Sequence, residues 1–189
     1  VALYKKLKTA HTNLLAVIDE AVLLYADGTG NGAAELQETI NKARQTANES
    51  ETTSEAMDVA TEELKNAIFK YRVLNATGTV PTVTTHHYVA RGSTVALGRS
   101  TVSGTNLLEQ GFCWSTEPNP TVLDNRSTKY YSQSGRIYAM ENLDPSTIYY
   151  VRAYAMTKDY AVGYGEVKKV ITLPAGKVKW TYDYGADAA

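Results

Sequence analysis

The side chains that most often bind metals or exchange protons are few in this sequence, and they are poorly spaced for either task. His86 and His87 are neighbours in a run that reads as a strand, so their side chains point to opposite faces and cannot hold one ion together. His11 lies in a part of the chain with helical periodicity. The single cysteine, Cys113, excludes an internal disulfide and a CxxC metal site. The sequence therefore predicts no metal site and no cofactor.

Acid–base and nucleophilic catalysis also lack their usual residue patterns. Carboxylate pairs such as Asp19-Glu20 and Glu62-Glu63 fall on predicted solvent-facing helix surfaces, where nothing shifts a pKa toward neutrality. The chain has no G-x-S-x-G or H-E-x-x-H motif. We expect no enzyme activity and no catalytic residue. Three aspartates near predicted turns lie outside any D-x-D-x-D-G pattern and are expected to cap those turns: Asp124, Asp144 and Asp159.

Tyrosine is the residue type that offers a binding surface. The chain has 14 tyrosines and two phenylalanines, and tyrosine packs at one end while tolerating water at the other. In the strand-like run 149–155, alternation places Tyr150, Arg152 and Tyr154 outward. Together with Tyr164 they form an aromatic stripe of the kind that stacks on sugars or anchors protein partners. The alternative is a cross-strand ladder that only covers the sheet.

The first part of the chain has the periodicity of helices. Apolar residues recur at spacings of four and three over residues 3–24, which predicts a helix of about six turns. Three glycines in residues 27–32 end it, and a second helix begins near Ala33. The expected inward residues are Leu3, Leu7, Ala10, Leu14, Val17, Ala21 and Leu24 in the first helix, and Leu36, Ile40, Ala43 and Ala47 in the second.

A third helix completes this half. Thr52 and Glu55 have the spacing of a capping box. Because short loops make neighbouring helices antiparallel, residues 1–76 are predicted to form an up-down-up three-helix bundle. The expected inward residues of the third helix are Ala56, Val59, Leu64, Ala67, Ile68, Tyr71 and Leu74.

After Pro81 the period of the apolar pattern falls from 3.6 to 2. Short runs rich in Val, Thr, Tyr and Ile are separated by Gly, Asn, Asp and Pro, with no helical pattern between them. This indicates an antiparallel β-sandwich of about seven strands over residues 81–174, joined to the bundle by a linker at 77–80. The predicted fold class is therefore α + β in two domains. The runs are Val83–Val89, Thr94–Val102, Glu109–Ser115, Arg136–Asn142, Tyr149–Ala155 and Glu166–Leu173.

The sandwich half carries a motif with a known structural role. Leu143-x-Pro145-x-Thr147-x-Tyr149-x-Val151 resembles the E–F corner of fibronectin type III-like domains, in which a tyrosine hydroxyl hydrogen-bonds back to the corner's backbone. The resemblance implies that Tyr149 is buried. Gly111-Phe-Cys-Trp-Ser-Thr-Glu-Pro-Asn-Pro-Thr121 and Gly163-Tyr-Gly-Glu166 are similar to fibronectin-like modules of large secreted and outer-surface proteins of gut-type bacteria.

The helical half resembles a second kind of bacterial surface module. Leu36-x-x-x-Ile40-x-x-Ala43 and Leu64-x-x-Ala67-Ile68 are similar to FIVAR-type helical modules of wall and surface proteins. The two resemblances imply an extracytoplasmic, cell-surface or secreted protein, anchored at the outer membrane in its full-length form. They imply a non-catalytic role in adhesion or as a spacer; the alternative is a carbohydrate-binding accessory module of a surface glycan-utilisation protein or secreted hydrolase.

Composition and the end of the chain complete the expectations. A formal charge of −1 provides no basic field for nucleic acid, and no apolar run reaches the roughly 18–20 residues that span a bilayer. We expect a monomer whose partner is an extracellular glycan or a host or bacterial surface protein. Residues 175–189, with Trp180 and Tyr182, leave the sandwich and are expected to be a tail or the start of a further domain.

Overall fold

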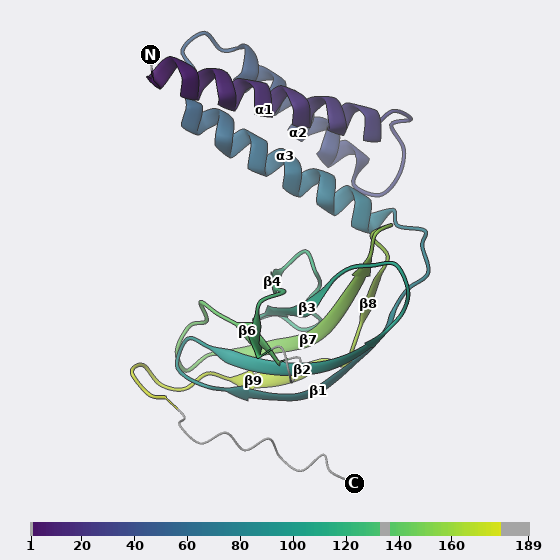
Figure 1. The fold of residues 1–189 in the computed structure, drawn as a ribbon, viewed down its shortest axis with the longest axis vertical. Coiled ribbons are helices and arrows are strands. Elements are labelled where there is room, and N and C mark those ends of the chain that lie inside the picture. The colour runs from purple at the N-terminus through teal and green to yellow at the C-terminus, as the bar shows by residue number, and fades with distance from the viewer. Residues whose placement is uncertain (1, 133–136, 179–189) are drawn as a thin grey trace. The chain divides into compact units, whose positions relative to one another are not determined.

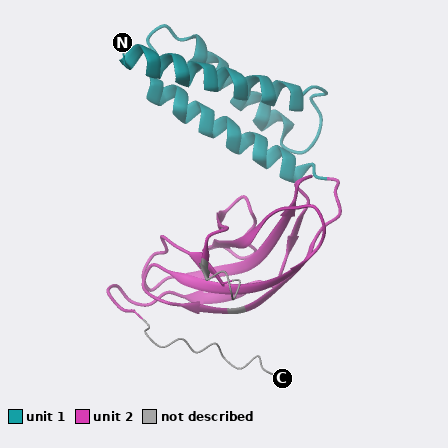
Figure 2. Ribbon diagram, viewed as in Figure 1, with its two compact units in different colours: residues 1–76 teal, residues 77–189 magenta. Residues whose placement is uncertain are grey.

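The structure is a computed structural model that describes residues 2–132 and 137–178. The chain divides into two compact units, Val1–Ala76 and Thr77–Ala189 (Figure 2). The described residues of the first unit form helices, and those of the second form strands. The predicted fold class, a helical bundle followed by an antiparallel sandwich, is confirmed.

Three helices make up the first unit (Figure 1). They are α1 (Ala2–Leu24), α2 (Ala33–Asn48) and α3 (Ser54–Leu74). Leu14, Leu36 and Leu64, one from each helix, are almost completely buried at the centre of the bundle. Every inward residue predicted for α2 is buried, because its apolar spacing follows the helical period without interruption. Within the described residues, no helix has both the length and the apolar composition needed to cross a membrane.

The predicted inward faces of α1 and α3 are wrong in part. Leu3 is 77% exposed, because it lies in the first turn of α1, before the first buried residue of that helix. Val59 is 58% exposed. The buried face of α3 instead includes Thr61, whose hydroxyl donates a hydrogen bond to the Met57 carbonyl at 2.7 Å and so enters the core without an unpaired polar group. The other predicted inward residues that are exposed are Ala56 and Leu74.

The start of α3 is capped one residue later than predicted. The N-cap is Thr53, whose hydroxyl accepts a hydrogen bond from the Ala56 N–H at 3.1 Å. The Glu55 carboxylate faces Lys6 of α1 at 2.5 Å instead of closing a capping box with Thr52. The capping box is therefore wrong, and Glu55 links two helices.

The second unit is a sandwich of two antiparallel sheets (Figure 1). One sheet has the order β1-β2-β6-β5, and the other has the order β4-β3-β7-β8 with β9 also paired to β7. This is the A-B-E-D and C′-C-F-G arrangement of immunoglobulin and fibronectin type III-like sandwiches. The strands are β1 (Thr82–Ala90), β2 (Ala96–Ser103), β3 (Leu107–Ser115), β4 (Asn125–Ser127), β5 (Tyr130–Ser132), β6 (Ile137–Met140), β7 (Ile148–Thr157), β8 (Val162–Tyr164) and β9 (Lys168–Ile171).

The core of the sandwich lies between the two sheets. Phe112 of β3 and Tyr138 of β6 meet across it, with ring centroids 5.8 Å apart. Val151 and Ala153 of β7 are fully buried on the same inner face, as the alternation predicted. Strands β4, β5 and β8 were not predicted, because each has only three residues and shows no alternation.

Two further features concern the edges of the unit. Strand β1 pairs with β2 and contains a bulge between Thr85 and Tyr88, at the two neighbouring histidines. Val178 forms an isolated antiparallel bridge with Gly92. Trp180 and Tyr182, on which the prediction of a further domain or tail depends, lie outside the described residues.

Candidate functional site

Tyr149 is the corner residue that the sequence motif predicted. Its ring is buried, and its hydroxyl accepts a hydrogen bond from the Asp144 N–H at 2.9 Å. The same hydroxyl donates to the Asp144 carboxylate at 3.2 Å, while Thr172 donates to the Asp144 carbonyl at 2.5 Å. These hydrogen bonds hold the backbone of the corner in place, so Tyr149 has a structural role.

Tyr149→Phe should lower the free energy of unfolding of the sandwich by about 1–3 kcal/mol, because it leaves the Asp144 N–H without its partner. The matched control is Tyr150→Phe, which keeps the ring that Lys169 approaches at 5.6 Å and should change stability by less than about 0.5 kcal/mol. Urea unfolding measures both. Equal losses, or a larger loss at Tyr150, would mean that the register of β7 is inverted.

The predicted exposure of Tyr154 in the aromatic stripe is wrong. Tyr154 is 0% exposed, and its hydroxyl donates to the Glu109 carboxylate at 2.9 Å. Its neighbour across the β3–β7 pair is Gly111, which has no side chain. The chain at Ser127 passes so close to this glycine that a Cβ there would lie 2.1 Å from the Ser127 carbonyl oxygen. The outer face of the sheet is therefore covered here.

Beside Ser127, the β3–β4 loop, residues 116–124, also lies over the outer face of the second sheet. Arg152 donates from Nε to the Pro120 carbonyl at 2.5 Å, and its guanidinium lies 3.9 Å from the ring centroid of Tyr164. The Tyr164 hydroxyl accepts from the Val122 N–H at 3.1 Å, and Val122 is fully buried. Arg152 and Tyr164 thus hold the loop. A ligand-binding role for Tyr150, Arg152 and Tyr164 stays a prediction.

Burial on the outer face of this sheet also sets the ionisation of three side chains. It raises the pKa of the Cys113 thiol to about 12, against the lowering effect of the nearby Arg152 charge. Burial, together with the Glu109 carboxylate, raises the pKa of Tyr154 well above its ordinary value. Burial likewise raises the pKa of Tyr164, and the hydrogen bond from Val122 opposes it. All three are neutral at pH 7, so none is an activated nucleophile.

The sequence-level expectations for metals and turns have mixed outcomes. Among residues 2–132 and 137–178, no three His, Cys, Asp or Glu side chains gather where a metal ion could bind. His86 contacts the Thr101 hydroxyl through its ring. Asp124 accepts hydrogen bonds from the backbone N–H and the hydroxyl of Thr121, at 2.7 and 3.0 Å. Turn capping is therefore confirmed for Asp124. The Asp144 carboxylate instead accepts from the Tyr149 hydroxyl, and turn capping by Asp159 stays a prediction.

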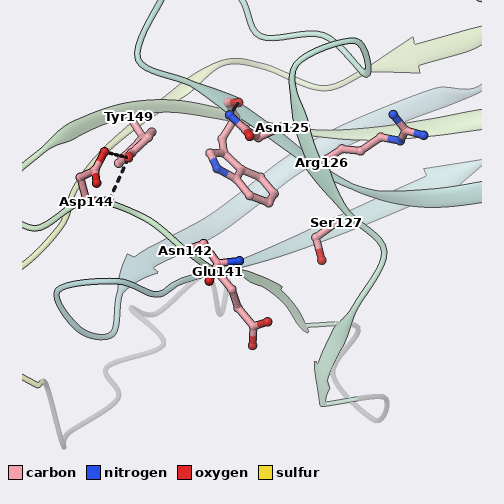
Figure 3. A pocket seen from close by; sticks show the side chains of 8 residues that line it. Asn125, Arg126, Ser127, Glu141, Asn142, Asp144 and Tyr149 are labelled. Atoms are coloured by element: carbon pink, nitrogen blue, oxygen red, sulfur yellow. Dashed lines mark hydrogen bonds between the residues drawn. The ribbon is translucent and has the colours of Figure 1, made fainter. Parts of the chain in front are cut away.

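The described surface of the sandwich contains a polar hollow of about 470 Å³ at the end where the corner lies (Figure 3). No sequence pattern predicts it, since its lining comes from separate segments of the chain. We call it the Trp114 hollow. Its lining residues are Trp114 from β3, Asn125, Arg126 and Ser127 from β4, Glu141 and Asn142 after β6, Asp144 in the corner and Tyr149 at the start of β7.

Two of the three charged residues that line the Trp114 hollow form ion pairs with residues outside its lining. Glu141 bonds to Lys129 through both carboxylate oxygens at 2.8 Å. Figure 3 shows the Arg126 side chain extending away from Glu141 and Asn142. Arg126 donates to the Val122 carbonyl at 2.9 Å and lies 3.5 Å from the Glu109 carboxylate. The hollow therefore presents chiefly neutral polar groups and one carboxylate, that of Asp144.

Comparison with solved structures gives likenesses at low sequence identity that cover about half of this chain. The sequence matches no protein-family model and no curated protein. A fibronectin type III domain of human contactin 1 is 16% identical, with a TM-score of 0.42 over 55% of this chain and 84% of that one. The sixth such domain of human fibronectin type III domain containing protein 3 is 22% identical, with a TM-score of 0.38 over 55% and 96%. The sensor domain of an anti-sigma factor from Pseudobacteroides cellulosolvens is 14% identical, with a TM-score of 0.35 over 52% and 99%.

Proposed function

We propose that this chain is a non-catalytic module of an extracellular bacterial surface protein, with a role in adhesion or as a spacer that presents other domains. The observation that carries the proposal is that each unit closes its own core. The buried residues of the helical core lie within 10–71 and those of the sandwich cores within 90–170, with none shared. Self-contained units in series are typical of chains that hold functional parts at a distance from an anchor.

The finer parts of the proposal rest on sequence resemblance. The FIVAR-like character of the bundle, the bacterial origin and the outer-membrane anchoring of the full-length protein belong here. The partner in an adhesion role is an extracellular glycan or a surface protein of the host or of another bacterium. The buried state of Cys113 and Tyr154 supports the absence of catalysis on the outer face, because neither side chain has an activated form at neutral pH.

Labelling of intact cells tests the location. An antibody raised against residues 2–178 should bind intact cells of the source organism, and brief treatment of those cells with a non-penetrating protease should remove the signal. The control is an antibody to a cytoplasmic protein, which should bind only after permeabilisation. If the antibody to this chain also requires permeabilisation, the surface role is wrong.

The second candidate function is that of a carbohydrate-binding accessory module. The aromatic stripe no longer carries it, because Tyr154 is buried and the β3–β4 loop covers Arg152 and Tyr164 in part. The observation that favours it is the Trp114 hollow, whose lining is polar and uncharged at most positions.

A further inference from the structure

The Trp114 hollow contains hydrogen-bonding groups that the protein does not use. Trp114 is 7% exposed and packs in the sandwich core, so only a small part of its indole reaches the hollow. Among the described residues, its indole N–H has no hydrogen-bond partner, and neither has the Asn142 side-chain amide. Polar groups at the wall of a hollow that lack protein partners are available to a ligand.

Acceptors face the same space. The Asp144 carboxylate receives one hydrogen bond, from the Tyr149 hydroxyl, and this leaves its other oxygen available. The Asn125 side chain makes a single long contact, from its amide nitrogen to the Trp114 carbonyl at 3.5 Å, so its carbonyl oxygen is also open. The lining of the hollow thus offers both N–H donors and oxygen acceptors.

The backbone holds one of these groups in place. Asn142 has a φ of 58°, in the left-handed region that asparagine tolerates better than most residues. It directly precedes the corner, where the Asp144 N–H donates to the Tyr149 hydroxyl and the Asp144 carbonyl accepts from Thr172, two residues later in the chain. The backbone that carries the amide is therefore held in place, which lowers part of the entropic cost of binding.

The charges select against ionic ligands. Glu141 is paired with Lys129 and Arg126 with Glu109, which leaves Asp144 without an ion-pair partner among the described residues. A phosphate, sulfate or carboxylate ligand would meet this negative charge, and an apolar ligand would leave the donors and acceptors unpaired. A neutral ligand whose hydroxyl groups both donate and accept satisfies all of them.

We propose that the Trp114 hollow binds a neutral saccharide unit, with Trp114 and Asn142 as donors and Asp144 and Asn125 as acceptors. Its volume of about 470 Å³ falls within the roughly 300–1,000 Å³ typical of small-molecule sites. The proposal gives the second candidate function a site and a ligand class, and it does not depend on the surface location.

Intrinsic fluorescence tests the proposal directly. The chain has two tryptophans, so Trp180→Phe leaves Trp114 as the only source of tryptophan fluorescence. Trp114 lines the hollow, so its emission should respond to a ligand there. Glucose, galactose, mannose and N-acetylglucosamine, and short neutral oligomers of each, are titrated at up to millimolar concentrations. At least one should change the Trp114 emission saturably.

Three variants locate the binding. Asn142→Gly removes the amide and keeps the left-handed backbone, and Asp144→Asn removes the charge; each should weaken binding about three- to tenfold. The matched control is Asn106→Gly, at another left-handed asparagine of this unit (φ 59°) outside the hollow, which should bind as the parent does. Thermal melting shows that each variant is folded.

Three results would overturn the proposal. The first is the absence of a saturable change with any of the sugars. The second is sugar binding that Asn142→Gly and Asp144→Asn both leave unchanged, which would place the site elsewhere. The third is a response to trilysine and to none of the sugars, lost in Asp144→Asn, which would make the hollow a site for cationic side chains. None of these results bears on the antibody labelling of intact cells.

Discussion

Gly163→Ala should destabilise the sandwich by more than about 3 kcal/mol, and it is expected to leave this unit unfolded at room temperature in mild denaturant. A Cβ on Gly163 would lie 1.9 Å from the Pro81 carbonyl oxygen and 2.9 Å from its carbon. Both atoms belong to the backbone, so no side-chain rotation relieves the clash. Strand β8 would have to separate from the start of β1, with loss of the contacts between the sheets at that end.

The matched control is Gly92→Ala in the same unit, where the nearest atom to an added Cβ is the Lys177 carbonyl oxygen at 3.7 Å. Its effect should stay within about 0.5 kcal/mol. Urea unfolding followed by Trp114 fluorescence measures both variants in the Trp180→Phe background. The helical signal in circular dichroism should persist in Gly163→Ala, since the bundle has its own core. A Gly163→Ala protein as stable as Gly92→Ala would show that Pro81 and β8 do not meet as described.

The sandwich should also lose stability steadily in alkali. The folded state holds the Cys113 proton more tightly than the unfolded chain, because burial raises its pKa from an ordinary 9.0 to about 12. The corresponding stabilisation is fully present below pH 9 and disappears as the pH rises toward 12. The loss is at most about 1.4 kcal/mol per pH unit for each such group. Tyr154, whose pKa is also raised, adds to the slope above pH 10.

Cys113→Ser separates the two contributions, because serine has nearly the size of cysteine and no proton to lose in this range. Its unfolding free energy should stay level to about pH 10, one unit further than in the parent, and then fall with the smaller slope. Urea midpoints collected between about pH 8 and 11 measure both proteins. Parallel curves would show that Cys113 ionises as freely in the folded state as in the unfolded one.

The parts of the fold that were predicted correctly depend on local sequence. The inward face of α2 follows from an unbroken helical period, and the burial of Tyr149 follows from the corner motif, whose hydrogen bonds span five residues. The incorrect inward residues of α3 have a local cause as well. Thr61 is buried in the core because its hydroxyl is hydrogen-bonded to the Met57 carbonyl. A prediction based on apolar residues alone does not include such a residue.

The errors at the candidate site have a different origin. Alternation correctly placed Tyr154 on the outer face of its strand, but its exposure depends on the missing side chain of Gly111 and on the chain at Ser127 that passes over it. The Trp114 hollow brings together segments that are far apart in the sequence, and each of its residues reads as an ordinary turn or strand residue. Pro118 and Pro120 were the available sign of a stiff, ordered loop.

The bulge in β1 bears on whether copies of this unit aggregate at high concentration. A long, flat strand with open N–H and C=O groups is a template onto which a neighbouring molecule can add its own strand, and this is how many sheet proteins aggregate. Strand β1 has nine residues, but the irregularity between Thr85 and Tyr88 breaks its ladder near the middle and twists the backbone there. An incoming strand would therefore meet two short, misaligned stretches, a built-in protection against polymerisation under crowding.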